Sequence, residues 1–166
     1  MRLLVLVLAC ATGACASSGA TPRPFPVPGH PAAAAVPGAS SRPADAYALT
    51  GTALALRGVP YRNGGSDPSG FDCSGFVRYV FAQHGLSLPR TVPEQFRAGR
   101  AVAGPLQPGD LVFFATTERS ASHVGIALGS DEFVHAPSST GVVRVERLSS
   151  AYWSSRYLGA RRALQP

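Results

Sequence analysis

The sequence predicts an α+β domain in which helices come first and an antiparallel sheet follows. Apolar residues recur at helical spacing in the first half of the domain, and short β-branched or aromatic runs separated by turn residues fill the second half. The chain has 166 residues, of which 45% are hydrophobic and 14% charged, so it is long enough for one domain with a buried core.

Three helices are predicted in the first half of the domain. The first starts near Asp45, which is a good N-cap residue, and ends before Gly58. The second covers 73–84, where apolar residues recur at helical spacing and Gly85 provides the C-cap. A third, short helix is predicted over 93–98.

The second half of the domain is predicted to form strands, because its apolar runs are short and turn residues separate them. A hairpin turn at 129–131 joins two of these strands. The predicted strands are 111–114, 123–128, 132–135, 142–145 and 158–164.

The charge pattern argues against a nucleic-acid partner. All fifteen cationic residues are arginine, against nine acidic residues, which gives a net charge of +6. The arginines are scattered, and neither a basic stripe interleaved with aromatic residues nor a glycine-rich phosphate-binding motif is present. A mildly basic surface would suit an anionic polymer.

The N-terminus has the pattern of an export signal. Met1 and Arg2 precede the apolar run 3–9, and small residues surround Cys10 and Cys15. The apolar run is far shorter than the roughly 20 residues that cross a bilayer.

The segment 14–18 resembles the lipobox of bacterial lipoproteins, which are cut just before a cysteine that then carries lipid. We therefore expect a lipoprotein signal peptide over 1–14 and lipidation of Cys15. Cys10 is the less favoured acceptor, because cleavage there would leave a leader of only nine residues. An ordinary cleaved secretory signal is the alternative.

The segment 15–44 is predicted to be a tether, and the folded domain to cover 45–166. Pro, Ala, Gly and Ser dominate the tether, and residues 21–43 hold seven of the fifteen prolines. Such segments are extended, at about 3 Å per residue, and can hold a domain several nanometres from a membrane.

Cys73 is the first candidate for chemistry. Processing at Cys15 would leave it as the only free thiol of an exported protein. It lies at the predicted start of a helix, where the helix dipole favours a thiolate and the free N–H groups can bind an oxyanion. A buried, inert cysteine is the alternative interpretation.

A thiol nucleophile needs a base, and His123 at the start of a predicted strand is the candidate. His135 ends the next strand, so a hairpin would bring the two rings together and let the second orient the first. A zinc site made by the cysteine, the histidines and an aspartate is the alternative. The short ligand spacings of most zinc sites are missing, so no metal and no cofactor is predicted.

These residues lie in segments that resemble the NlpC family of cell-wall cysteine peptidases, particularly its Spr-type lipoprotein members. Four further segments are also similar to that family, and the resemblance covers 46–164. The three segments with the candidate site residues are 72–76, 123–126 and 133–136; the others are 60–65, 88–91, 107–111 and 152–157.

The resemblance implies a papain-like fold in which the helix with the cysteine packs on a sheet that carries the histidines. It implies Cys73 as nucleophile, His123 as general base and His135 as the orienting third residue. Tyr61 matches a family tyrosine beside the thiol that helps the oxyanion; a packing role alone is the alternative. Asp72 and Ser74, which flank the nucleophile, are candidates for oxyanion or substrate contacts; helix capping is the alternative for Asp72.

The resemblance also implies a peptidoglycan endopeptidase that acts through a cysteine thioester. Cleavage of the crosslink between D-Ala and diaminopimelate is preferred; the alternatives are cleavage between D-Glu and diaminopimelate, or a catalytically silent peptidoglycan-binding module. The expected partners are peptidoglycan and, through the lipid anchor, a membrane, with a regulatory adaptor or protease left open. The expected location is the cell envelope, on the outer membrane facing the periplasm.

Overall fold

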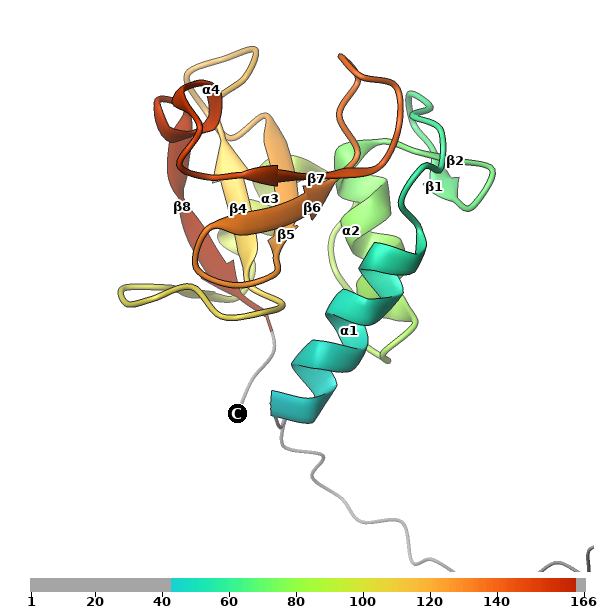
Figure 1. The fold of residues 1–166 in the computed structure, drawn as a ribbon, viewed down its shortest axis with the longest axis horizontal. Coiled ribbons are helices and arrows are strands. Elements are labelled where there is room, and N and C mark those ends of the chain that lie inside the picture. The colour runs from blue at the N-terminus through green and yellow to red at the C-terminus, as the bar shows by residue number, and fades with distance from the viewer. Residues whose placement is uncertain (1–42, 164–166) are drawn as a thin grey trace, which may run out of the picture. The chain divides into compact units, whose positions relative to one another are not determined.

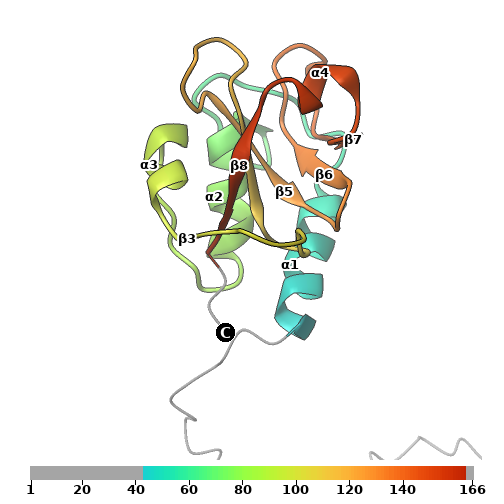
Figure 2. The same ribbon diagram turned by 90° about the vertical axis from the view of Figure 1, so that its left-hand side faces the viewer.

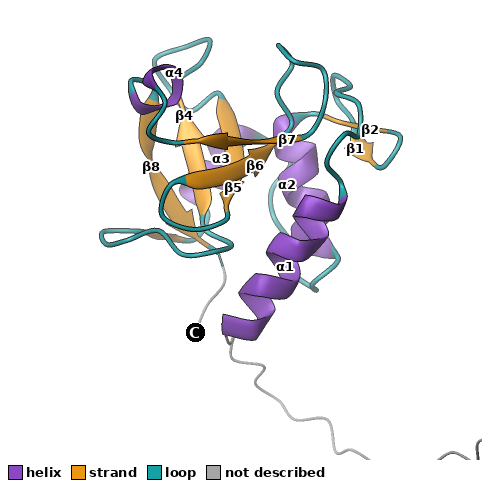
Figure 3. Ribbon diagram, viewed as in Figure 1, coloured by secondary structure: helices purple, strands orange, loops and turns teal. Residues whose placement is uncertain are grey.

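The computed structural model of the chain describes residues 43–163, which form a mixed α+β arrangement (Figures 1 and 3). The predicted fold class is therefore confirmed. The predicted signal peptide, most of the predicted tether, and both candidate lipidation sites, Cys10 and Cys15, lie outside the described residues.

The element order follows the predicted sequence of helices and then strands, with several short elements added. The helices are α1 (Pro43–Ala55), α2 (Cys73–Ala82), α3 (Val92–Arg97) and α4 (Ala151–Ser154). The strands are β1 (Ser66–Asp67), β2 (Gly70–Phe71), β3 (Arg100–Ala101), β4 (Leu111–Phe114), β5 (His123–Ala127), β6 (Glu132–His135), β7 (Arg144–Arg147) and β8 (Tyr157–Arg162).

One six-stranded antiparallel sheet, in the order β3-β8-β4-β5-β6-β7, organises the domain. The strands β4, β5 and β6 are neighbours, so the last residue of β4, Phe114, lies opposite the first residue of β5, His123. A separate two-stranded ribbon of β1 and β2 precedes α2. The candidate histidines therefore lie on strands in the middle of the sheet.

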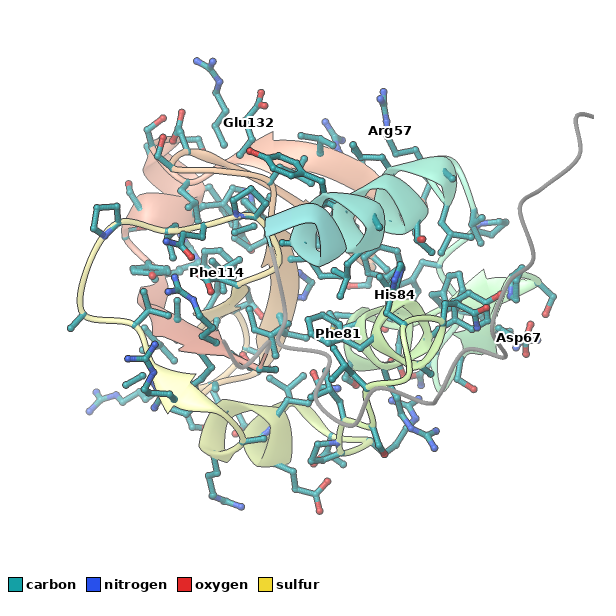
Figure 4. All side chains as sticks on the ribbon, turned by 90° about the horizontal axis from the view of Figure 1, so that it is seen from below. Arg57, Asp67, Phe81, His84, Phe114 and Glu132 are labelled. Atoms are coloured by element: carbon teal, nitrogen blue, oxygen red, sulfur yellow. The ribbon has the colours of Figure 1, made fainter. Side chains whose placement is uncertain are left out.

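The two faces of this sheet pack against different partners. Helices α1, α2 and α3 cover one face, where the large hydrophobic cluster includes Phe76, Phe81 and Val124 (Figure 2). The other face carries a smaller cluster that includes Phe114 and Trp153 of α4. Figure 4 shows Phe81 and Phe114 inside the molecule and Arg57, Asp67 and Glu132 at its periphery.

The element boundaries differ from prediction where tertiary pairing decides them. The first helix begins at Pro43 rather than with Asp45 as its N-cap, because proline is well suited to the first helical turn. The predicted strand 142–145 is displaced to 144–147, because the Val143 N–H donates to the Val59 carbonyl at 2.9 Å in a separate contact. The last strand starts one residue early and ends at Arg162.

A buried ion pair joins the turn before β4 to β8. Asp110 accepts two hydrogen bonds of 2.7 Å from Arg162, and a third of 2.8 Å from the Gln107 backbone N–H. The Asp110 side chain is only 2% exposed. A buried carboxylate needs this full set of donors, so the pair fixes β8 against β4.

None of the helices in residues 43–163 combines the length and the apolar character that crossing a membrane requires.

The Asp110 pair gives a test of the fold. We expect Arg162→Met to lower the free energy of unfolding by about 3 kcal/mol, because it leaves a buried carboxylate without its partner. Arg147→Met is the matched control, since Arg147 is 69% exposed and its pair with Asp131 is worth less than about 1 kcal/mol. Urea unfolding measures the free energy of unfolding of both variants. Equal losses would contradict the conclusion that the Asp110–Arg162 pair stabilises the fold.

Candidate active site

Cys73 is the first residue of α2, and Asp72 is its N-cap. The Asp72 carboxylate accepts a hydrogen bond of 2.7 Å from the Gly75 N–H and so fixes the first turn. The Asp72 N–H donates to the Gly65 carbonyl at 3.0 Å, and a Cβ at position 75 would overlap with that same oxygen. The close approach of the loop therefore requires glycine at position 75.

The two candidate histidines form a hydrogen-bonded pair. His123 begins β5 and His135 ends β6, and His123 Nε2 lies 2.7 Å from His135 Nδ1. Gly125 provides the space, because a Cβ there would lie 2.6 Å from the Phe133 ring and 3.2 Å from His135 Cβ. The predicted proximity of the histidines is confirmed, and their catalytic roles stay predictions.

The sulfur of Cys73 lies at the start of β5. The backbone N–H of Val124, the residue after His123, donates a hydrogen bond to it. His123 uses Nε2 to contact His135, which leaves Nδ1 as the nitrogen available for a proton. The fold thus places a thiol beside the strand residue that carries the candidate base, with the second imidazole behind that base.

Trp153 covers the histidine pair on the sheet face opposite α2. Its ring stacks on His123 with centroids 5.4 Å apart and meets His135 edge-on at 5.0 Å. Its indole N–H donates to the Glu146 carboxylate, which holds the ring in place. The sequence analysis assigned no role to Trp153; its signal was one large aromatic side chain in a largely polar segment.

Burial keeps both histidines neutral at pH 7. His123 is 8% exposed and His135 is fully buried. Burial lowers the pKa of His123 to about 4. The pKa of His135 is also lowered, first by burial and then by His123 and Arg144.

The N–H groups at the start of α2 lower the pKa of Cys73 as predicted, but the net pKa of the thiol is raised. Burial, followed by the Asp72 carboxylate, raises the pKa of Cys73 to about 11. Backbone N–H groups of Val124, Ser74 and Cys73 itself lower it, as predicted for a helix start, but they do not outweigh the loss of solvation. The resting site therefore holds a neutral thiol beside neutral imidazoles.

Asp72 and Ser74 both contact Arg90, which lies in the segment 88–91 that resembles the family; a border of the groove and a solvated loop are the two interpretations of that segment. Arg90 Nη1 lies 3.0 Å from Asp72 Oδ1 and Nη2 lies 2.5 Å from Oδ2. Arg90 Nη1 also donates to Ser74 Oγ at 2.9 Å. Both side chains are thus engaged within the protein, and their oxyanion or substrate roles stay predictions.

Tyr61 lies in the same neighbourhood as the thiol. Burial raises the pKa of its phenol, and the proximity of Cys73 and then of Asp72 raises it further. Its backbone N–H donates to the Gly141 carbonyl at 2.7 Å, which ties this segment to the loop before β7. Tyr61 therefore lies near enough to Cys73 for their charges to interact, and its role toward the oxyanion stays a prediction.

The described residues show no cluster of three or more His, Cys, Asp or Glu side chains placed to hold a metal ion. Cys73 is a free thiol. The described residues thus bring together a thiol and two imidazoles, and the roles of nucleophile, base and orienting group stay predictions.

A family model and a solved structure that resemble this chain name the same family. The model of the NlpC/P60 family matches residues 58–162. A solved structure of an NlpC/P60 family protein from Bacillus cereus ATCC 10987 has a TM-score of 0.67 and 37% identity, covering 72% of this chain and 40% of that chain. The fold is therefore that of the family.

Two curated relatives match this chain over 110 and 109 residues. Murein DD-endopeptidase MepS/Murein LD-carboxypeptidase of Escherichia coli (strain K12) is 46% identical over 110 residues, which are 65% of this chain and 57% of the relative. Gamma-DL-glutamyl hydrolase of Bacillus subtilis (strain 168) is 47% identical over 109 residues, which are 63% of this chain and 26% of the relative. The matches thus span about half or less of each relative's length.

The packing of Trp153 on the histidines gives a test by NMR. We expect the imidazole of His123 to stay neutral down to about pH 5, because its pKa is lowered to about 4. Trp153→Ala should raise this pKa toward the ordinary value of about 6.5, because the ring becomes solvated. Tyr152→Ala, at a neighbouring residue that is 50% exposed, is the control and should leave it unchanged.

Titration of the His123 ring signals against pH measures these values. A midpoint near 6.5 in the parent protein would contradict the conclusion that burial under Trp153 lowers the pKa of His123.

Proposed function

Because the family model matches most of its folded part, the chain belongs to the NlpC/P60 family, and we propose that it is a peptidoglycan endopeptidase that hydrolyses amide bonds of murein stem peptides or crosslinks. The observation that carries this proposal is the arrangement of Cys73 at the start of α2, against the strand whose His123 is hydrogen-bonded to His135. A thiol, a base and a group that orients the base are what a cysteine hydrolase needs, which supports the proposal.

In the first step, Cys73 is the nucleophile. Its sulfur bonds to the carbonyl carbon of the scissile amide while its proton passes to His123 Nδ1. Because His123 Nε2 contacts His135 Nδ1, the second imidazole holds the ring in one orientation. His123 then gives the proton to the leaving amine, the C–N bond breaks, and a thioester on Cys73 remains.

In the second step, water replaces the amine. His123 takes a proton from the water while the water oxygen bonds to the thioester carbon. The C–S bond then breaks, and His123 returns the proton to the sulfur, which releases a carboxylic acid and regenerates the thiol. The α2 backbone N–H groups and the Tyr61 hydroxyl are the donors for the oxyanion of both steps.

The resting site is a neutral pair rather than an ion pair. The pKa of Cys73 is raised to about 11 and that of His123 is lowered to about 4. Charge separation at rest is therefore unfavourable, and proton transfer has to accompany the attack on a bound carbonyl. Such a site keeps the thiol little ionised until substrate is present.

For the scissile bond, we favour the crosslink between D-Ala and diaminopimelate. The name of the Escherichia coli relative, a murein DD-endopeptidase, supports this choice. The name of the Bacillus subtilis relative, a gamma-DL-glutamyl hydrolase, supports the alternative cut between D-Glu and diaminopimelate. The complete set of Cys73, His123 and His135 argues against the third candidate, a catalytically silent binding module.

The proposed location is the cell envelope. The signal over 1–14 with lipidation at Cys15, or less favourably at Cys10, would anchor the chain, and the tether over 15–44 would let the domain reach peptidoglycan. The outer membrane facing the periplasm is the proposed site of the anchor.

The test is mass spectrometry of muropeptides released from purified sacculi by the full chain. We expect the parent to convert crosslinked dimers to monomers and Cys73→Ala to do so at least roughly 10³-fold more slowly, because the nucleophile is missing. Ser154→Ala, an exposed position outside the site, is the control.

Shortened stems instead of separated dimers would move the cut to the D-Glu bond. Equal cleavage by parent and Cys73→Ala would refute the cysteine mechanism, and binding without cleavage by the parent would favour the silent module.

A further inference from the structure

Asp72 creates an electrostatic problem for the nucleophile beside it. Its carboxylate is needed at the start of α2, where it accepts hydrogen bonds from the Gly75 N–H and from Ser74 Oγ. Its side chain is only 14% exposed, so water screens the charge poorly. A thiolate at Cys73 would therefore form next to a second, poorly solvated anion.

Arg90 is placed to compensate this charge. Its two terminal nitrogens contact the two oxygens of Asp72, in the fork geometry that makes arginine and carboxylate a strong pair. The same Nη1 donates to Ser74 Oγ, so the guanidinium contacts the side chains on both sides of the nucleophile. Arg90 is the residue that brings a fixed positive charge to this turn.

A buried amide holds the Arg90 segment against α2. Gln95 of α3 is fully buried, and its Nε2 donates to the Ser74 carbonyl at 3.1 Å and to the Pro89 carbonyl at 2.8 Å. One side chain thus ties the residue before Arg90 to the residue after Cys73. The position of the guanidinium is fixed by the fold and not only by its own charge.

We propose that Arg90 is a positioning residue that holds and neutralises the Asp72 carboxylate, so that the thiolate of Cys73 forms beside an ion pair rather than beside an uncompensated anion. The inference rests on the proposed function, since it assigns a supporting residue to the same nucleophile. Arg90 acts through Asp72, and nothing in this role requires it to contact substrate.

The electrostatics of the neighbourhood agree with this role. The pKa of Arg90 is raised, chiefly by its hydrogen bonds with Asp72, and Cys73 adds to the increase. The Asp72 carboxylate is the charge that raises the pKa of Cys73 after burial. The charged or titratable groups that surround the thiol from the neighbouring elements are Tyr61, Asp72, Arg90, His123 and, behind it, His135.

The test measures the ionisation of Cys73 without any substrate. Iodoacetamide reacts with the thiolate, whose sulfur displaces iodide, so below the midpoint the rate at each pH is proportional to the thiolate fraction and reports any shift of the midpoint. Mass spectrometry of the peptide that contains residue 73 separates its reaction from that of the other cysteines. The variants are Arg90→Met, Asp72→Asn and the double variant, and Arg147→Met, in an exposed pair, is the control for loss of one positive charge.

Arg90→Met should move the midpoint upward by at least about one pH unit, which lowers the rate at a given pH about tenfold. Asp72→Asn should move it downward. The double variant should return close to the parent, because the pair as a whole is removed, and Arg147→Met should leave the midpoint unchanged.

An unchanged midpoint in Arg90→Met, or a double variant that stays as high as Arg90→Met, would overturn the inference, since a purely structural role predicts no such reversal. If Arg90→Met does not fold by circular dichroism, Arg90→Gln replaces it. That variant keeps a hydrogen-bond donor but removes the charge, and its midpoint should lie above that of the parent; no shift would overturn the inference. Muropeptide cleavage is scored separately, so failure of the proposed function and failure of this inference are distinguishable.

Discussion

The carboxylate of Asp72 is the group on which the site depends. It caps α2 by accepting a hydrogen bond from the Gly75 N–H. The backbone N–H of the same residue donates to the Gly65 carbonyl and holds that loop against the first turn of α2. These contacts place Cys73 at the point where α2 meets β5. The same carboxylate opposes ionisation of the thiol, so the interaction that positions the nucleophile also restrains it, and the site needs a compensating charge such as Arg90.

The sheet gives the site its second constraint, which is burial on both faces of β5. Val124 and Ile126 pack under the helices, whereas the histidines lie on the opposite face under Trp153. Packing on the two faces thereby removes solvent from the thiol and from both imidazoles. Burial raises the pKa of the acid and lowers that of the base, and both shifts favour the neutral forms.

Sequence reasoning predicted the parts of the site that depend on local pattern. The helix that starts at Cys73 follows from its apolar spacing, and the proximity of His123 and His135 follows from a hairpin with a recognisable turn. The strand at 144–147 was placed two residues early because Val143 is used in a contact with Val59, 84 positions away in the chain, which no local pattern reports.

The electrostatics of the site could not be predicted in the same way. The rule for a helix N-terminus is local, whereas the pKa of Cys73 is set mainly by burial under β5. Arg90 and Trp153 act across long sequence separations, so their roles become visible only when the fold brings them to Asp72 and to the histidines.

The claim that Cys73 performs the chemistry can be tested most directly by following alkylation of this one residue against activity. The full chain is treated with limiting iodoacetamide, the modified fraction of Cys73 is measured by peptide mass spectrometry, and muropeptide cleavage is assayed on the same samples. The account predicts that activity falls in proportion to the modified fraction and reaches zero at full modification, whatever the state of Cys10 and Cys15. Cleavage that persists when Cys73 is fully modified would contradict it.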